Sequence, residues 1–451
     1  MGGVSRTNDE VGGGGAGGAG LGAAGGGSAT GAVGAGAGAA GGGSGAGGVG
    51  GGAVGGGSGT GAVGGGSGGG VNLGALRSHN AALVLDLLRT AGPDGISRLE
   101  LAERTGLTPQ AVSKITARLR EDGLVAEAGR RASTGGKPRT VLRLVPEAGH
   151  AVGVHLDRDE LTAVLCDLTG AVVARRSAAL DLGAGAETVV ERAVREVGEL
   201  VGQGGRSDAG GRGPAAQFPA PPVGSGDRRP RVLGVGVALP GPLDHRRGVL
   251  HRVTGFPQWN GFPLRDVLAR RLSLPVVVDK DTNAAALGLA VGGDAGALAS
   301  FAYLHFGAGL GGGLVIGGAV HRGARTGAGE FGHQVVQLDG PPCGCGNRGC
   351  VEALCLAAVA RGDAAEAARV LGTAAGNLVA LLDVDLVLLG GRTIAAAPET
   401  FVRGVAAVLD ERAGRAGEDP VPVRIAPGER GGVAEGAAQL LLAPLFGRAE
   451  G

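Results

Sequence analysis

The chain has 451 residues, of which 98 are glycine, and its formal net charge is +1 at pH 7. A charge this close to neutral is no evidence by itself for a nucleic-acid partner, and no apolar run approaches the about 20 residues that cross a membrane. No charged segment followed by an apolar one marks a secretory signal, so we expect a cytoplasmic protein without a membrane span.

The first 70 residues form a low-complexity segment of Gly, Ala and Ser that holds 37 of the 98 glycines. Such small side chains bury too little surface to offset the entropy lost on folding, so we predict a disordered tail over 1–70. The patterns that follow predict two folded domains, over 71–146 and 151–446.

Two short helices are predicted after the tail. Leucines at helical spacing mark the first, over 76–90, and the Gly-Pro-Asp-Gly sequence at 92–95 ends it. Ser97 and Glu100 are spaced as a capping box at the start of the second, which continues through Arg104.

A third helix is predicted from its cap, Thr108, to Asp122, after a turn at Gly106. Two helices joined by a tight turn are typical of a helix-turn-helix, whose second helix enters the major groove of DNA. The polar side chains predicted to contact DNA from this helix are Thr108, Gln110, Ser113, Lys114 and Arg118.

Two short strands, 124–125 and 141–144, flank a basic loop over 129–139. Five Lys and Arg residues and no acidic residue lie between positions 130 and 143, which favours contact with phosphates or the minor groove. The alternatives are a solvated basic hairpin and a helix-turn-helix that binds protein instead of DNA. The residues predicted to contact DNA from this winged segment are Arg130, Arg131, Lys137 and Arg139.

The second domain begins with alternating apolar residues that predict a β-meander, followed by a helix over 186–201. Residues 202–231 are rich in Gly, Pro and Arg without periodicity, so we predict a surface insertion. Further on, a strand over 276–278 runs into Asp281 and a helix. Asp281 therefore either caps this helix or acts as a general base.

One imidazole and three thiols are spaced to hold a metal. His333, Cys343, Cys345 and Cys350 can close a tetrahedral zinc site, and because they fill all four positions the zinc would be structural. Disulfides are rare in the cytosol, which disfavours the alternative of a disulfide or unligated thiols.

These residues carry a resemblance to a known family. Glu-x-Gly-His at 330–333 and Cys-x-Cys-Gly-x-x-Gly-Cys-x-Glu at 343–352 resemble the zinc and sugar motif of the ROK family, which comprises sugar kinases and related sugar-responsive repressors. The resemblance implies an α/β fold for 151–446, the two-lobed actin-like (ribonuclease H-like) ATPase fold, with zinc bracing a sugar pocket.

The resemblance also implies the ligands of the sugar. Asp281, Glu330, His333 and Glu352 would contact sugar hydroxyls, and Asp281 stands where the family's kinases carry the base that deprotonates a sugar hydroxyl. Lys280 stands where family kinases carry Asn, and we expect it to be a flexible cation beside the sugar. Leu-Arg-x-His-Asn at 76–80 and Ser-Thr-Gly-Gly-Lys-Pro-Arg at 133–139 resemble the winged helix fused to ROK repressors, which implies DNA binding.

The phosphate-binding features of the family's kinases are altered in this chain. Where the kinases carry Asp-x-Gly-Gly-Thr, positions 155–159 read His-Leu-Asp-Arg-Asp, so Asp157 and Asp159 are expected to face the space of a triphosphate and repel it. Ala308 stands where a Thr is usual, and the segment after Glu352 is shorter than in relatives.

The resemblance therefore implies a sugar-responsive DNA-binding regulator, a homodimer or homotetramer, that binds ATP and Mg²⁺ poorly. Two alternatives remain open. One is a glucokinase-like ROK sugar kinase with a fused DNA-binding domain, and the other is a zinc-stabilised scaffold for protein interactions.

Overall fold

The computed structural model describes residues 79–131, 139–204, 230–253, 255–292, 300–428 and 432–448. The predicted tail over 1–70, the start of the first predicted helix and most of the predicted insertion lie outside the described residues. So do the tip of the winged segment, with Lys137, and the side chains of Arg130 and Arg131.

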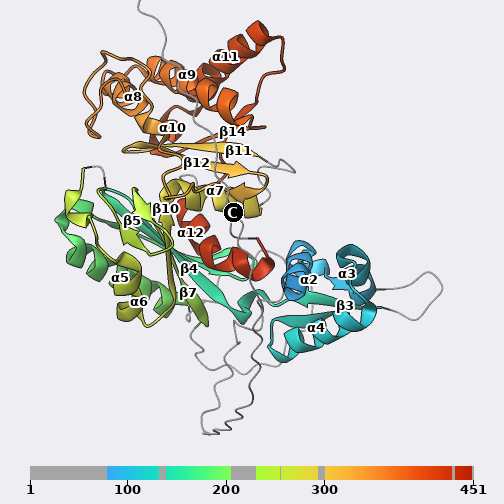
Figure 1. Ribbon diagram of the computed structural model, residues 1–451. Helices are drawn as coiled ribbons and strands as arrows, with labels where there is room; N and C mark the ends of the chain where they lie inside the picture. Colours follow the sequence, from blue (N-terminus) through green and yellow to red (C-terminus); the bar gives the residue numbers. More distant parts are fainter. Residues whose placement is uncertain are drawn as a thin grey trace, which may run out of the picture. The chain divides into compact units, whose positions relative to one another are not determined.

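The first domain is a winged helix-turn-helix (Figure 1). Ser97 caps α3 in a capping box with Glu100, and the Thr108 hydroxyl caps α4 by accepting from Ala111 N–H, both as predicted. The strands of this first domain form an antiparallel sheet in the order β1-β3-β2. The elements are α2 His79–Thr90, β1 Ile96–Ser97, α3 Arg98–Thr105, α4 Pro109–Glu121, β2 Val125–Arg131 and β3 Arg139–Leu144.

The winged segment differs from its prediction. Ladder pairing continues to Arg131 opposite Arg139, so Arg130, Arg131 and Arg139 lie in strands and not in a loop. The short strand β1 was also not predicted, because two residues are too few to show a period.

The first lobe of the second domain is a five-stranded sheet in the order β10-β7-β4-β5-β6. β4, β5 and β6 form the predicted antiparallel meander, and β7 and β10 run parallel to β4. The helix predicted over 186–201 continues to Gly204, into the predicted insertion. The elements are β4 His150–Leu156, β5 Glu160–Asp167, β6 Val172–Ala179, α5 Ala186–Gly204, β7 Val232–Leu239, β8 Leu243–Asp244, β9 Val249–Leu250, α6 Leu264–Leu272 and β10 Val276–Lys280.

The second lobe repeats this topology. Its sheet has the order β13-β12-β11-β14-β15, so in both lobes the third, second, first, fourth and fifth strands lie side by side, with the last two parallel to the first. This repeat is the two-lobed α/β fold that we expected. The elements are β11 Phe301–Phe306, β12 Leu310–Ile316, β13 Ala319–Val320, α8 Val351–Ala360, α9 Ala364–Leu382, β14 Val387–Gly390, α10 Arg392–Ala396, α11 Pro398–Ala416 and β15 Val423–Ile425.

Two helices, α7 (Asp281–Gly292) and α12 (Val433–Leu442), lie between the two sheets (Figure 1). They meet at Gly436, where a Cβ atom would lie 1.9 Å from the Ala284 carbonyl oxygen, so the two backbones touch. After α12, the short helix η7 (Ala443–Phe446) packs on α2 of the winged helix: Phe446 lies 5.2 Å under the Arg89 guanidinium. None of the described helices is both long and apolar enough to cross a membrane.

Candidate metal centre and ligand cleft

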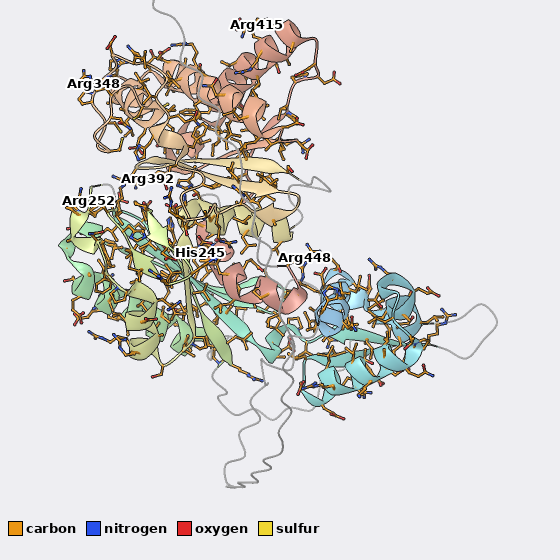
Figure 2. The ribbon with its side chains drawn as sticks, in the orientation of Figure 1. His245, Arg252, Arg348, Arg392, Arg415 and Arg448 are labelled. Atoms are coloured by element: carbon orange, nitrogen blue, oxygen red, sulfur yellow. The ribbon has the colours of Figure 1, made fainter. Side chains whose placement is uncertain are left out.

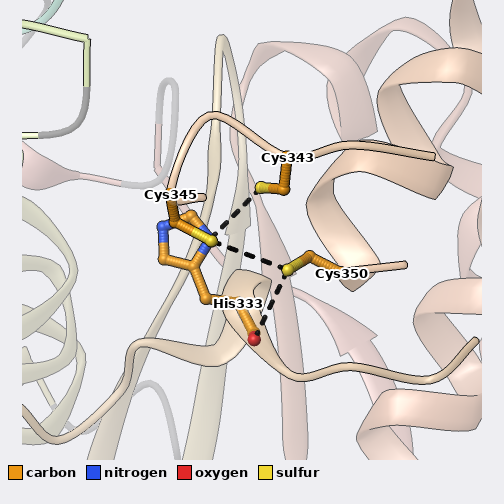
Figure 3. A group of neighbouring side chains, drawn as sticks. All are labelled: His333, Cys343, Cys345 and Cys350. Carbon is orange, nitrogen blue, oxygen red and sulfur yellow. Dashed lines mark hydrogen bonds between the residues drawn. The ribbon is translucent and has the colours of Figure 1, made fainter. Parts of the chain in front are cut away.

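The four predicted zinc ligands converge on one point (Figure 3). Their ligand atoms all lie within 4.8 Å of one another. Cys343 Sγ is 3.7 Å from His333 Nδ1, and Cys345 Sγ is 3.7 Å from Cys350 Sγ. Ligands at about 2.3 Å from a tetrahedral zinc are about 3.8 Å apart, so the arrangement fits this ion.

Local backbone contacts shape the loop that carries these ligands. Cys343 N–H donates to Asn347 O at 2.8 Å, which closes a tight turn around Cys345. Gly349 has a φ of +67°, and a Cβ there would lie 1.6 Å from Gln337 O, so only glycine fits. Cys350 is fully buried at the N-terminus of α8.

The three thiols lie close together, and a bound cation would stabilise their deprotonated forms. Burial, followed by the neighbouring Cys345 and Cys343, raises the pKa of Cys350 to about 12. A bound divalent metal reverses this preference, because it deprotonates a coordinating thiol. Since Nδ1 of His333 faces the thiols, its other ring nitrogen remains for the neighbouring cleft, which His333 also lines.

A cleft lies between the lobes beside this centre. The five residues predicted to contact a sugar all line it, although they come from positions up to 72 residues apart: Lys280, Asp281, Glu330, His333 and Glu352.

Lys280 is not the flexible cation that we expected. Its side chain is 3% exposed, and its ammonium donates to Glu330 Oε1 at 3.0 Å and to Ala328 O at 2.5 Å. The ion pair forms because the loop carrying Glu330 returns across the end of β10. Lys280 therefore holds in place one carboxylate oxygen of Glu330, a residue predicted to contact the sugar.

The other carboxylates of the cleft are each anchored through one oxygen. Glu352 is buried and accepts from Leu310 N–H at 2.8 Å. Asp281 begins α7 and accepts from Thr282 N–H at 2.7 Å, so it is placed at the strand-to-helix junction that the sequence indicated. Asp157 lines the cleft and accepts from Arg158 N–H at 2.7 Å.

Asp159 differs from its prediction, because it does not line the cleft. It forms an ion pair with Arg392, whose Nη1 lies 2.9 and 2.7 Å from the two carboxylate oxygens. Arg392 belongs to the second lobe and lies at the boundary between the lobes (Figure 2). Of the two aspartates expected to repel a triphosphate, only Asp157 therefore lines the cleft.

Sequence reasoning missed two residues that line the cleft, Arg158 and His305. Burial lowers the pKa of His305, whose Nδ1 lies 2.9 Å from the Tyr303 hydroxyl, so the imidazole is held neutral. Arg158 stands within the altered phosphate motif, at a position where the family's kinases carry glycine. This change from glycine to a cation is the sequence feature that could have identified Arg158 as a cleft residue.

The residues of α4 and its cap that we predicted to contact DNA lie on the face of this helix turned away from the core. All five on α4 and its cap are exposed, whereas Val112, Thr116 and Leu119 on its other face are buried. Arg139, at the start of β3, is exposed too.

Comparison with known proteins agrees with the folds of both domains. The model of the ROK family matches residues 223–362, which include all four metal-ligand candidates and the cleft-lining residues other than Asp157 and Arg158. The chain carries a ROK-family domain. The model of the MarR family matches residues 77–133, the winged helix that precedes the ROK domain.

Two curated relatives are transcriptional regulators by name. Over 257 residues the chain is 29% identical to the xylose repressor of Caldicellulosiruptor bescii, covering 57% of this chain and 59% of the relative. Over 286 residues it is 30% identical to the DNA-binding transcriptional dual regulator NagC of Escherichia coli, covering 63% and 64%. The chain thus aligns with about three fifths of the length of these curated relatives.

A solved structure supports the fold. A ROK-family transcriptional regulator, described as a homologue of the Escherichia coli MLC protein, superposes with a TM-score of 0.64 at 22% identity, over 83% of this chain and 98% of that structure.

Proposed function

We propose that this chain is a DNA-binding transcriptional regulator, a repressor, whose ROK domain binds a sugar. The observation that carries the proposal is the presence in one chain of an exposed polar α4 and a carboxylate-lined cleft beside four converging metal-ligand candidates. The names of the relatives, a xylose repressor and a DNA-binding transcriptional dual regulator, support the same proposal.

The DNA-binding half rests on exposure and charge. Gln110, Ser113, Lys114 and Arg118 supply hydrogen-bond donors on the open face of α4, the chemistry that reads base edges in a major groove. Basic residues at the ends of β2 and β3 would neutralise phosphates. A homodimer or homotetramer would present two such helices to successive major grooves.

The sugar-binding half rests on the arrangement of acceptors. Carboxylates accept hydrogen bonds and do not donate them, so Asp281, Glu330 and Glu352 suit a ligand rich in hydroxyl groups. His333 would join the metal centre to this ligand. Zinc in this site would be structural, because no ligand position is left for water.

The same cleft argues against kinase activity. Asp157 lines it at a position where the family's kinases carry glycine, and a triphosphate would have to enter beside this charge. Ala308 also offers no hydroxyl to a phosphate. ATP and Mg²⁺ would therefore bind poorly, and the protein would sense its sugar in the cytoplasm without phosphorylating it.

A response to sugar requires a connection between the halves. α7 begins with Asp281 in the cleft and touches α12. After α12, Phe446 of η7 contacts α2, and Arg448, two residues further on, forms an ion pair with Asp86 of α2 at 2.9 Å. Closure of the lobes on a sugar would move α12 and with it the winged helix.

Fluorescence anisotropy tests the proposal. The full chain is titrated against a palindromic fragment from upstream of its own gene and against a scrambled duplex, with and without glucose, xylose and N-acetylglucosamine. We expect preference for the palindromic fragment and a change in its affinity with one sugar. Equal affinity for both duplexes under all conditions would refute the proposal and favour a scaffold for protein interactions.

A further inference from the structure

The Arg158 guanidinium is a cation in a cleft whose other charged groups are mostly acids. We infer that Arg158 contacts the effector directly, by donating hydrogen bonds to an oxygen of a neutral, unphosphorylated sugar. This inference rests on the proposed function and specifies the ligand of the same cleft.

The turn that carries Arg158 is held on both sides. Arg158 O accepts from Leu182 N–H at 3.0 Å, and the next residue, Asp159, is paired with Arg392 of the second lobe. The guanidinium itself lies 5.7 Å from the centre of the Phe256 ring, within the range of a cation–π contact. Arg158 is therefore positioned in advance of ligand binding, which lowers the entropy cost of using it.

Gly309 shows where the guanidinium points. A Cβ atom at this position would lie 3.2 Å from Arg158 Nη2 and 3.0 Å from Glu352 Oε2. A donor from the first lobe and an acceptor from the second thus approach one point, and glycine leaves that point open. Within the described residues no carboxylate pairs with Arg158 at 4.0 Å or less.

A sugar needs such a donor. Each of its hydroxyl groups both donates and accepts, whereas the carboxylates of the cleft can only accept. The Lys280 ammonium has three N–H groups and already uses two of them on Glu330 and Ala328. The guanidinium of Arg158 has five, so it is the largest source of donors facing the cleft.

The charge of the cleft then selects among sugars. Four carboxylates face two cations, which leaves the lining with a formal charge of −2 when the histidines are neutral. A phosphate group adds about −1.5 to −2 at pH 7. The cleft therefore favours a free sugar over its phosphate ester, even though Arg158 is present.

Isothermal titration of the full chain tests the inference with glucose, xylose, N-acetylglucosamine, glucose 6-phosphate and N-acetylglucosamine 6-phosphate. For the sugar that binds the wild type, Arg158→Ala is expected to raise Kd by about tenfold to a hundredfold, the range for a hydrogen bond to a charged group. Arg158→Lys should recover part of the loss, and the phosphate esters should bind more weakly than their parent sugars.

Two controls separate this inference from the proposed function. Arg361→Ala removes an exposed cation at the end of α8 and should leave Kd unchanged, and operator affinity without sugar should be equal in all variants. An unchanged Kd in Arg158→Ala, or tighter binding of a phosphate ester, overturns the inference alone. If the wild-type chain ignores every sugar of the panel, the inference and the sugar half of the proposed function are both wrong.

Discussion

Replacing Gly436 by Ala tests the contact between α7 and α12. An added Cβ atom would lie 1.9 Å from Ala284 O, whereas real Cβ contacts are essentially never under 3.0 Å, so the helices would have to separate by about 1 Å. α12 cannot move away from α7 freely, because its other side is also tightly packed. On its other side Gly153 and Gly236 bring β4 and β7 into equally close contact with its backbone.

The expected loss can be worked out from this geometry. Overpacking costs about 1–3 kcal/mol, and the upper end applies here because both sides of α12 are closed. Alanine returns about 0.5–1 kcal/mol through its helix propensity, which leaves about 2 kcal/mol of destabilisation. For a domain of this size that corresponds to a fall in Tm of about 4–8 °C.

Thermal unfolding followed by circular dichroism measures the effect, with Gly198→Ala as the matched control. Gly198 lies within α5, and a Cβ there would meet nothing within 4 Å. The control should therefore gain about 0.5–1 kcal/mol. A Gly436→Ala variant that melts at or above the wild-type temperature, while the control behaves as expected, would refute the close packing of the two helices.

Three further predictions concern the metal, the cleft and the DNA surface. Elemental analysis should find one zinc per chain, and Cys345→Ser should lose the metal and melt at a lower temperature; freshly purified, reduced protein without metal would contradict the assignment. A coupled assay across common hexoses should detect no ATP-dependent phosphorylation, and turnover in the ordinary kinase range of about 1–100 s⁻¹ would restore the kinase alternative. Arg139→Ala should weaken binding to operator and scrambled duplex alike and lower the salt slope by about 0.9, if it neutralises one phosphate. Gln110→Ala should instead cost about 1–3 kcal/mol of discrimination at one base pair with an unchanged slope, and identical behaviour of the two variants in anisotropy titrations would argue against their separate roles.

Features set by neighbouring residues could be predicted from the sequence. The capping box of Ser97 and Glu100 and the Thr108 cap depend on hydrogen bonds that span three residues, so their spacing is sufficient to recognise them. The metal-ligand candidates are likewise confined to positions 333–350, and their side-chain types and intervals indicate the ion.

Features set by distant residues emerged only in the tertiary structure. The ion pair of Lys280 with Glu330 spans 50 positions and that of Arg392 with Asp159 spans 233, and no periodicity links such pairs. Arg158 reaches the cleft from a turn that is fixed by Leu182 in the first lobe and by the pair of Asp159 with Arg392 in the second. The sequence by itself thus determined the local chemistry of the site, whereas the packing of two lobes decided which of its charged groups are already paired and which remain for a ligand.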